Sequence, residues 1–470
     1  MKSRLGLICT ACLLTACTVG PDYHPPKLPV SGNWERGNQV IRMDGQTVPA
    51  KWWTIFDDTL LDNLVERALH ANHNLRIARA RAAEARALRG EARADLFPTI
   101  TANAQSERIR TSRNDLGADE FTTNLSSHRY QLGFDAAWEL DFFGRNQRSL
   151  EAATADLNAQ LADLAALHIT MAAEVARNYI ELKGVQARKI VAEKTLTNLH
   201  TLAELTNALI ERGVINNIDL MRINAEIKTR EAGLFVLTAE VEQTIHGLSV
   251  LIGEQPMALN NELNQPAPIP FHAKMPAIAV PALVLRKRPD IMASERELAA
   301  ATARIGVVTA ELYPRITLMG DGGYLSASTG KLIERQSLFG SIGPQFHWPP
   351  FDGGRIRAQV AAADARAQQA LVRFEQVVLR ALEETETALS AWHRGDRRAD
   401  ALRSAHLTSR NSARITKQRY EAGLESFIHV LDAQRSSYDA EDAYTAAQVE
   451  VGVALIAVLK ATAEGINNKP

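Results

Sequence analysis

The chain has 470 residues, and its 53 lysine and arginine residues nearly balance its 54 acidic residues, for a formal net charge of −1. This balance leaves no basic surplus to neutralise a phosphate backbone, so nucleic acid is not an expected partner. All three cysteines, Cys9, Cys12 and Cys17, lie in the first 17 residues. This placement excludes disulfides, thiolate metal sites and cysteine nucleophiles from the rest of the chain.

Residues 1–16 have the layout of an export signal, with basic residues, an apolar run and then small residues before Cys17. The apolar run is too short to span a bilayer as a mature helix. The sequence Leu14-Thr15-Ala16-Cys17 resembles a bacterial lipobox, which implies a covalent lipid on the sulfur of Cys17. An ordinary signal peptide cleaved nearby is the alternative.

The residue after the cysteine is Thr18. The lack of an aspartate there removes the usual signal for staying at the inner membrane, so the lipobox resemblance implies sorting to the outer membrane. One lipid anchor gives reversible attachment, and stable residence needs a second membrane-binding element. We therefore expect the rest of the chain to supply one.

Prolines divide the mature chain into two long arms. None occurs from residue 99 to 255 or from 351 to 469, whereas seven lie between Pro256 and Pro289. Each arm carries apolar residues at steps of three and four, which predicts coiled-coil helices. The 68 residues from Arg145 to Arg212 would form a rod of about 100 Å, far longer than the helices of a compact domain.

The two halves of the chain repeat one another, which predicts a pseudo-symmetric framework. Each half runs from a helix to an aromatic-proline break, a variable stretch, a passage from Trp to Gly-Arg, and a long helix with a glycine turn. The matching landmarks are Leu96-Phe97-Pro98 with Leu312-Tyr313-Pro314, Trp138 with Trp348, Gly144-Arg145 with Gly354-Arg355, and Gly213 with Gly423.

The stretches between each proline break and the following Gly-Arg change to an alternating period. Residues 130–138, 316–324 and 342–348 alternate apolar with polar side chains, and the polar segments 111–127 and 326–336 are the expected tips of the two hairpins. This pattern is typical of membrane β-barrel strands, although a half-buried soluble sheet has comparable local support. Two hairpins give four strands, which cannot close a barrel in lipid, so several chains are expected to share one barrel.

Taken together, the lipobox, the internal repeat and five further motifs resemble the TolC-type outer membrane factors, in the lipoprotein branch called NodT or RND-efflux outer-membrane lipoproteins. The resemblance covers the mature chain. It implies a homotrimer with a 12-stranded β-barrel, four strands from each chain, continued by a periplasmic α-helical barrel. It also implies docking to a periplasmic adaptor protein and an inner-membrane resistance-nodulation-division (RND) pump. The motifs that carry it are Cys17-Thr18-Val19-Gly20-Pro21-Asp22-Tyr23, Arg288-Pro289-Asp290, Phe351-Asp352-Gly353-Gly354-Arg355, Tyr420-Glu421-Ala422-Gly423 and Val430-Leu431-Asp432-Ala433-Gln434-Arg435-Ser436.

The resemblance places the two glycine turns at the periplasmic tip, where the helices reverse and the channel narrows. Glycine suits a reversal because it enters positive φ without a Cβ penalty. The residues expected at the tips, where an adaptor would dock, are Arg212, Gly213, Val214, Ala422, Gly423 and Leu424.

By position, Tyr420 and Asp432 match the constriction residues of the family, and Asp219 matches their partner. A ring of three aspartates in a narrow aqueous neck would favour cations. Two departures leave the closed-state hydrogen bonds open: His429 lies where some relatives have a second aspartate, and Glu425 lies where the best-known member has an arginine lock. His429 could give this gate some pH sensitivity.

No catalytic constellation occurs in the sequence: it lacks a His-Glu-x-x-His motif, a Gly-x-Ser-x-Gly motif and a phosphate loop. We therefore expect no enzyme, no metal and no cofactor beyond the lipid on Cys17. The favoured function is a passive exit duct for drugs or other small molecules in an RND-type pump. A duct for secreted protein in a type I exporter and a purely structural periplasmic coiled coil are the alternatives.

The expected protein is a lipid-anchored component of the outer membrane that extends into the periplasm. Its expected segments are a lipoprotein signal peptide (1–16), an extended lipid-anchored segment (17–56), helices of the first repeat (57–97), the first β-hairpin (98–143), the first long helical hairpin (144–255), a proline-rich linker (256–288), a helix of the second repeat (289–313), the second β-hairpin (314–352), the second long helical hairpin (353–464) and a C-terminal tail (465–470).

Overall fold

The computed structural model describes residues 18–26, 34, 51–110, 112, 126–213, 217–270 and 280–463. The expected signal peptide, Cys17, Val214 and the expected C-terminal tail lie outside these ranges. The chain forms two compact units. The first unit contains Met1–Pro26, Arg81–Gln160 and Ala293–Phe374, and the second contains Lys27–Ala80, Leu161–Met292 and Glu375–Pro470.

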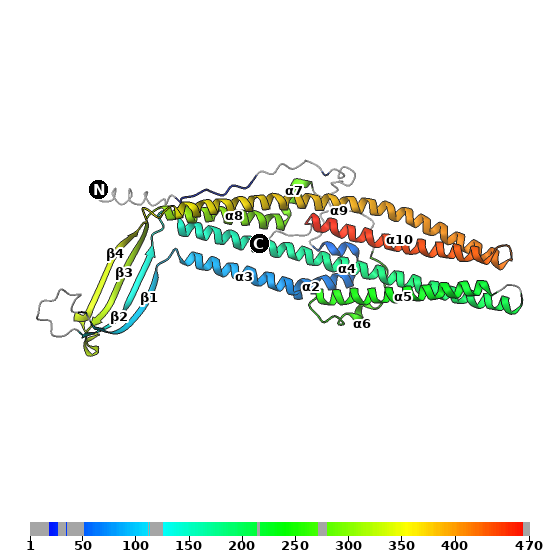
Figure 1. Cartoon of the computed structure of the whole chain (residues 1–470), viewed down its shortest axis with the longest axis horizontal. Coiled ribbons are helices and arrows are strands. Elements are labelled where there is room, and N and C mark those ends of the chain that lie inside the picture. Colours follow the sequence, from blue (N-terminus) through cyan, green and yellow to red (C-terminus); the bar gives the residue numbers. More distant parts are fainter. Residues whose placement is uncertain are drawn as a thin grey trace. The chain divides into compact units, whose positions relative to one another are not determined.

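The first unit contains a four-stranded antiparallel sheet, drawn in Figure 1. Its strands follow one another in the sheet in sequence order, so the contact between β2 and β3 joins the two repeats. Among the described strands, β1 and β4 each have a neighbour on one side only, which leaves two open edges. The strands are β1 (Thr99–Arg110), β2 (Ser126–Glu139), β3 (Arg315–Ser326) and β4 (Leu338–His347).

The strand register gathers apolar side chains on one face of the sheet. Trp138 pairs with Leu318, Leu132 pairs with Tyr324, and Ile316 pairs with Phe346, and directly paired residues point to the same face. The opposite face is polar, and it carries hydrogen bonds from Asn103 to Asp135 and from Ser341 to Asp321. The alternation expected from the sequence is therefore present as one apolar and one polar face.

A pair of glycines sets the close approach of β2 and β3. Gly133 lies opposite Gly323. A Cβ on Gly133 would lie 2.6 Å from the Gly322 oxygen, and a Cβ on Gly323 would lie 2.2 Å from the Leu132 oxygen. A side chain at either position would therefore force the two repeats apart at their shared strand pair.

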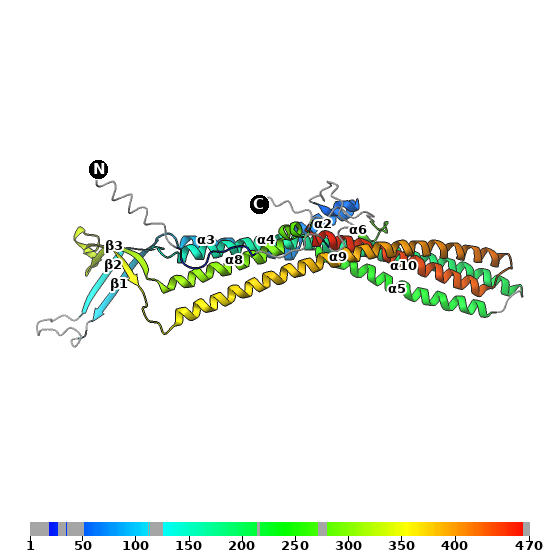
Figure 2. The ribbon, with the colours of Figure 1, turned by 90° about the horizontal axis from the view of Figure 1, so that it is seen from above.

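Two helical hairpins follow the two β-hairpins along the chain. The first joins α4 (Arg145–Glu211) to α5 (Ile218–Leu251), and the second joins α9 (Arg355–Glu421) to α10 (Phe427–Ala461). Figures 1 and 2 both show the two members of each hairpin side by side. Helices α4 and α9 have 67 residues each. The shorter elements are η2 (Trp52–Phe56), α2 (Thr59–Ala71), α3 (His73–Ala94), α6 (Asn260–Leu263), α7 (Pro281–Lys287), α8 (Pro289–Thr309), η3 (Ala310–Leu312), η4 (Thr329–Lys331) and η5 (Arg335–Ser337).

The hydrophobic core of the second unit contains residues of both helical hairpins and of α2. Leu64 of α2, Ile180 of α4, Leu248 of α5, Leu389 of α9 and Leu455 of α10 are all buried in it. Burial of one such side chain contributes roughly 1.5–3 kcal/mol. The core therefore holds both helical hairpins together, and it explains the apolar stripes at steps of three and four.

Helix α2 is held on this core by a polar contact. Asp58 caps the helix by accepting hydrogen bonds from the amides of Leu60 and Leu61 at 2.9 and 3.1 Å. The Tyr179 hydroxyl donates to the other oxygen of the same carboxylate at 2.9 Å. The cap thus connects α2 to α4.

Among the described helices, α10 is the one long and apolar enough to cross a membrane by length and composition, and half of its most apolar window is buried. Val451, Leu455, Val458 and Leu459 of α10 belong to the core of the second unit. Its apolar character is accounted for by this packing.

Candidate channel gate

The two hairpin turns have the same backbone geometry. Gly213 and Gly423 both have φ of +71°, and their amides donate to the carbonyls of Ile210 at 2.8 Å and Tyr420 at 2.9 Å. Among the described residues other than the chain neighbours of each glycine, no heavy atom lies within 4 Å of a Cβ built on either glycine. Glycine is therefore required at these turns by the left-handed backbone and not by crowding.

The other residues expected at the tips lie around these turns. Arg212, Ala422 and Leu424 are exposed, and the Leu424 amide closes the second turn by donating to the Arg419 carbonyl at 2.8 Å. The Leu424 side chain is 67% exposed beside this turn.

Tyr420 lies at the end of α9, against the start of α10. Its ring centroid is 5.8 Å from that of Phe427 at an interplanar angle of 66°, and it packs on a cluster that includes Ile223 of α5 and Leu431 of α10. Burial, with a smaller contribution from the charge of Asp219, raises the pKa of the Tyr420 hydroxyl. The hydroxyl is therefore a neutral hydrogen-bond donor at physiological pH, and its oxygen is buried without a hydrogen-bond partner among the described residues.

The two aspartates of the expected gate have different surroundings. Asp219 lies in the first turn of α5, half-buried, with Oδ1 3.6 Å from Nη1 of Arg222. Asp432 lies on the exposed side of α10, where its charge acts on Arg435. The structure thus brings Asp219 close to Tyr420, and it leaves Asp432 on a separate exposed helix face.

His429 and Glu425 form a local network within the second hairpin. Nδ1 of His429 lies 2.6 Å from Oε1 of Glu425, and Nε of Arg419 lies 3.4 Å from Oε2. The hydrogen bond with His429, with help from the Ser426 amide, lowers the pKa of Glu425. The Glu425 carboxylate therefore has its polar partners within its own hairpin.

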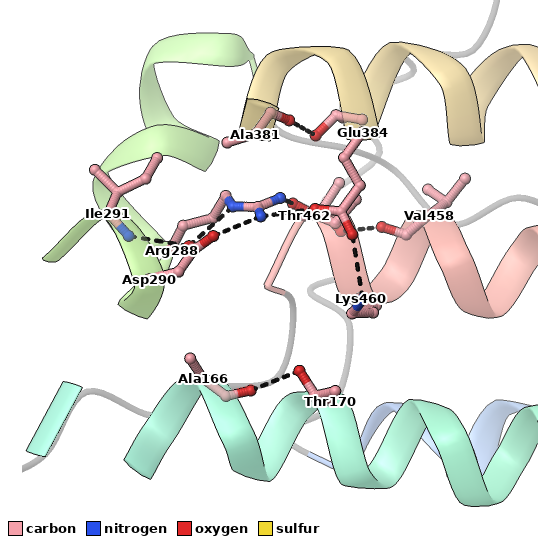
Figure 3. Close-up of polar contacts among 12 residues, drawn as sticks. Ala166, Thr170, Arg288, Asp290, Ile291, Ala381, Glu384, Val458, Lys460 and Thr462 are labelled. Carbon is pink, nitrogen blue, oxygen red and sulfur yellow. Dashed lines mark hydrogen bonds and ion pairs between the residues drawn. The ribbon is translucent and has the colours of Figure 1, made fainter. Parts of the chain in front are cut away.

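The Arg288-Pro289-Asp290 motif has a structural role in the second unit, shown in Figure 3. The Arg288 side chain is 9% exposed and donates to Asp290 Oδ2, Glu384 Oε2 and the Ala461 carbonyl, each at 2.7 Å. Ala461 is the last residue of α10, so the guanidinium supplies positive charge at a helix C-terminus. Lys460 reaches the other oxygen of Glu384 at 3.3 Å. The cluster anchors the C-terminal end of α10 to the start of α8 and to α9.

Residues Thr18–Tyr23, here called the N-terminal strap, are held in the first unit by hydrogen bonds. The Val19 amide donates to the Phe143 carbonyl at 3.1 Å. The buried Arg148 of α4 donates to Asp22 Oδ1 at 2.6 Å, and the Tyr23 hydroxyl donates to Glu295 at 3.0 Å. These contacts fix the chain directly after the expected lipidation site.

The strap lies in a notch made by glycines. A Cβ on Gly20 would lie 2.4 Å from the Cα of Gly306, and a Cβ on Gly144 would lie 2.6 Å from the Thr18 side chain. Gly20 and Gly144 also have φ of +92° and +77°. Glycine at these positions therefore lets the strap lie directly against α8 and against the residue that precedes α4.

Each repeat thus contributes one β-hairpin and one long helical hairpin, and the two β-hairpins form one sheet with an apolar face and open edges. These features define the class of outer-membrane channels that are built from a shared β-barrel and a helical barrel. The family model described as "Outer membrane efflux protein" matches residues 64–254 and 280–464, and the chain belongs to this family. The chain is thus an outer-membrane efflux channel, and the family and fold class predicted from the sequence are confirmed.

Several individual proteins resemble this chain over most of its length. The chain is 30% identical to nodulation protein T of Rhizobium leguminosarum bv. trifolii over 433 residues, which covers 90% of this chain and 89% of that protein. It is 30% identical to outer membrane protein OprJ of Pseudomonas aeruginosa over 455 residues, which covers 97% and 94%. The solved structure of the outer-membrane channel OprN superposes with a TM-score of 0.89 at 36% identity, covering 95% of this chain and 99% of that one.

The sequence predicted the turn glycines, Tyr420, Asp219 and Asp432 as gate residues, and their role in a gate stays a prediction. Two contacts beside these residues were not predicted. Phe427 forms the aromatic contact with Tyr420, and Glu226 of α5 is buried against Arg435 of α10. The motif that contains Arg435 was recognised, but its partner lies 209 positions away. Only the folded chain shows that pairing.

Proposed function

We propose that this chain forms, as a homotrimer, the outer-membrane exit channel of a tripartite RND-type efflux pump. The channel conducts drugs or other small molecules passively, without catalysis, from the periplasmic pump to the outside. One observation carries a barrel shared by several chains: the four-stranded sheet has an apolar face and two open edges. In lipid these edges need hydrogen-bond partners, and further copies of the same sheet supply them. The number of three chains is what the resemblance to the outer membrane factors implies.

The names of similar proteins support the part of the proposal that concerns pump partners. Similar proteins include the "Probable efflux pump outer membrane protein TtgC" of Pseudomonas putida and the "Cation efflux system protein CusC" of Escherichia coli. In this proposal a periplasmic adaptor docks on the exposed tips, Arg212, Gly213 and Val214 of the first hairpin and Ala422, Gly423 and Leu424 of the second. An inner-membrane RND pump supplies the substrate to this assembly.

Tyr420, Asp219 and Asp432 form the resting gate in this proposal, with His429 beside it. Three copies of Asp432 make a ring of carboxylates in a confined neck, where their charges are less screened than on an open surface. Such a ring attracts hydrated cations and slows conduction when they bind. The exposure of Asp432 supports this role, because an exposed carboxylate keeps its charge available to a passing ion.

The channel role is tested with purified protein in planar lipid bilayers. Wild type should give discrete conductance steps and should migrate as a trimer that dissociates only on heating in detergent. A soluble monomeric species without conductance would contradict the proposal. Loss of antibiotic resistance on deletion of the gene, restored by the wild-type gene, would support efflux, whereas loss of a secreted protein would indicate a type I exporter.

The gate is tested by substitution. Asp432→Ala should weaken block by divalent and trivalent cations by about tenfold or more, because the carboxylate ring is gone. Tyr420→Phe combined with Asp219→Ala should raise mean conductance by loosening the closed state. Neither change should dissociate the trimer, because the helix cores are untouched. Wild-type conductance and cation block in all these variants would refute the gate assignment while the channel role remains.

A further inference from the structure

A group of basic side chains lies on the apolar face of the sheet, at the end of β1 and β2 that is far from the helices. Strand β1 follows α3 and begins at Thr99, so its last residue, Arg110, lies at that far end. The register pairs Arg108 with His128 and Arg110 with Ser126, and directly paired residues point to the same face. The side chains of Arg108, Arg110 and His128 are exposed, and we call these three residues the rim patch.

The rim patch continues the apolar face and not the polar one. His128 and Tyr130 are two residues apart in β2, and their rings are stacked with centroids 6.1 Å apart. Leu132 and Phe134 follow at the same step of two, so they lie on the same face. The surface that faces lipid therefore changes from apolar to basic directly beyond Tyr130.

The spacing along β2 puts this change at the level of the lipid headgroups. Trp138 and Tyr130 lie on the apolar face eight residues apart, which corresponds to about 27 Å along the strand. Membrane strands tilt by about 35–45°, so the pair spans roughly 20 Å of depth, close to the apolar band of about 25 Å that aromatic residues border. The pair of Arg108 and His128 lies beyond this band. Because the helices extend into the periplasm from the other end of the sheet, the rim patch lies at the outer leaflet.

The rim patch also differs from the polar face in its charge balance. On the polar face, Nε of Arg129 lies 3.9 Å from Oε1 of Glu107, so this arginine has a carboxylate partner. Within the part of the chain that the structure describes, Arg108 and Arg110 form no ion pair. A guanidinium binds phosphate oxygens through charge-assisted and often bidentate hydrogen bonds. A phosphorylated headgroup in the outer leaflet would supply the negative charge that this surface lacks.

We propose that the rim patch binds the phosphate groups of the phosphorylated lipid of the outer leaflet, for which lipid A is the probe. The two guanidinium groups donate to the phosphate oxygens, and the His128 ring offers a further N–H donor. The acyl chains of the same lipid lie against Leu132 and Phe134. Strand β1 is an edge of the sheet, so the bound lipid lies beside the seam between two copies and stabilises the trimer. The inference uses the shared barrel of the proposed function and not the gate.

The first test measures lipid binding to the purified trimer in detergent by native mass spectrometry. Wild type should bind added lipid A, and the double variant Arg108→Gln with Arg110→Gln should bind it about tenfold more weakly, because two charge-assisted contacts are lost. Arg129→Gln is the matched control, because it removes the same charge from the residue next to His128 but on the polar face. The control should bind as wild type does. Equal affinity of wild type and the double variant, or an equal loss in Arg129→Gln, would overturn the site.

Changes to the ligand identify the part of the lipid that is recognised. Lipid A without its phosphates should bind wild type about tenfold more weakly than intact lipid A. Excess inorganic phosphate should not displace the lipid, because it lacks the acyl chains that contact the apolar face. Equal binding of the two lipids would mean that acyl chains alone hold them, and displacement by free phosphate would indicate a site for a small anion. Either result would overturn the proposal.

The second test measures the temperature at which the trimer dissociates in detergent. Lipid A should raise this temperature for wild type and for Arg129→Gln, because a ligand of the assembled state stabilises it, and it should leave the double variant unchanged. Without lipid A, wild type and the double variant should dissociate at the same temperature and give the same conductance steps. If the double variant does not assemble, Arg108→Gln and Arg110→Gln are measured singly, each with a smaller expected loss of the lipid effect.

The two readouts also separate failure of the lipid site from failure of the barrel. A wild-type trimer that conducts normally but dissociates at a temperature independent of lipid A would overturn the lipid site and leave the channel role in place. A wild-type protein that forms neither trimers nor conductance steps would refute the shared barrel and the lipid site with it.

Discussion

Arg288 belongs to a motif of the family, and its contacts in this chain give it a structural role. Its guanidinium joins the start of α8, α9 and the C-terminal end of α10 through Asp290, Glu384 and the Ala461 carbonyl. Two of these partners are carboxylates that remain partly exposed. The cost of losing the arginine is therefore shared between unpaired charges and an uncapped helix end.

Arg288→Met keeps most of the side-chain volume and removes the charge. We expect it to destabilise the protein by about 2 kcal/mol, because charge-assisted hydrogen bonds in a buried site are lost. The measurement is the temperature at which the detergent-resistant trimer dissociates. Lys51→Met removes an exposed pair with Glu66 and should change this temperature little. Equal effects of the two substitutions would contradict the structural role of Arg288.

At the residue scale, the sequence predicts the positions where the local backbone conformation requires a particular residue type. The turns at Gly213 and Gly423 could be predicted because the internal repeat marks them and because a left-handed backbone favours glycine. The contact between Glu226 and Arg435 could not be predicted, because these residues are 209 positions apart and charged residues are common on helix surfaces. Which of them becomes buried depends on packing that no local pattern records.

At the scale of elements, the N-terminal strap is the part that the sequence indicated least. The motif after Cys17 was recognised as a family marker, but its partners Arg148, Glu295 and Gly306 belong to α4 and α8. The strand and helix periods, in contrast, are set by the apolar face of each element, so the sheet and the long helices could be predicted. The glycines that form the notch for the strap do not recur at a regular spacing in the sequence, so no periodic pattern predicts the notch.

Gly306→Ala tests the notch. Helix propensity alone favours alanine over glycine by roughly 1 kcal/mol, but a Cβ here would lie 2.8 Å from Cγ of Arg148 and 2.9 Å from the Val19 oxygen. We therefore expect net destabilisation and faster proteolysis of the strap. Gly90→Ala in α3 is the control, since a Cβ built on Gly90 has no atom of another described segment within 4 Å. Gly90→Ala should be neutral or stabilising, and the same result for Gly306→Ala would mean that the strap is not seated.

At the scale of the whole molecule, two membrane-binding elements are proposed, the shared barrel and the lipid on Cys17. The backbone groups along the two edge strands cannot all find hydrogen-bond partners within one chain, since the described sheet has only four strands. A single lipid gives weak, reversible attachment. The barrel is therefore expected to hold the protein in the membrane, and the lipid to serve earlier steps of sorting and orientation.

Cys17→Ser separates these contributions. Radiolabelled palmitate should label wild type and not the variant, and the variant should still form detergent-resistant trimers because the sheet is unchanged. Label in both proteins would defeat the lipid assignment. A labelled wild type with a purely monomeric variant would instead show that the lipid is needed for assembly of the barrel.

The membrane role of the sheet itself is tested on β4, where the two faces differ most clearly. Ile342 lies on the apolar face and is 80% exposed, whereas Gln345 lies on the polar face opposite Thr317. An arginine facing lipid near the middle of the bilayer costs about 2–4 kcal/mol, and one facing the lumen does not. Ile342→Arg should therefore reduce the yield of trimer in the outer-membrane fraction, while Gln345→Arg should keep that yield and alter cation conductance. A half-buried soluble sheet would give no such asymmetry, so equal yields of the two variants would exclude Ile342 from a lipid-facing surface.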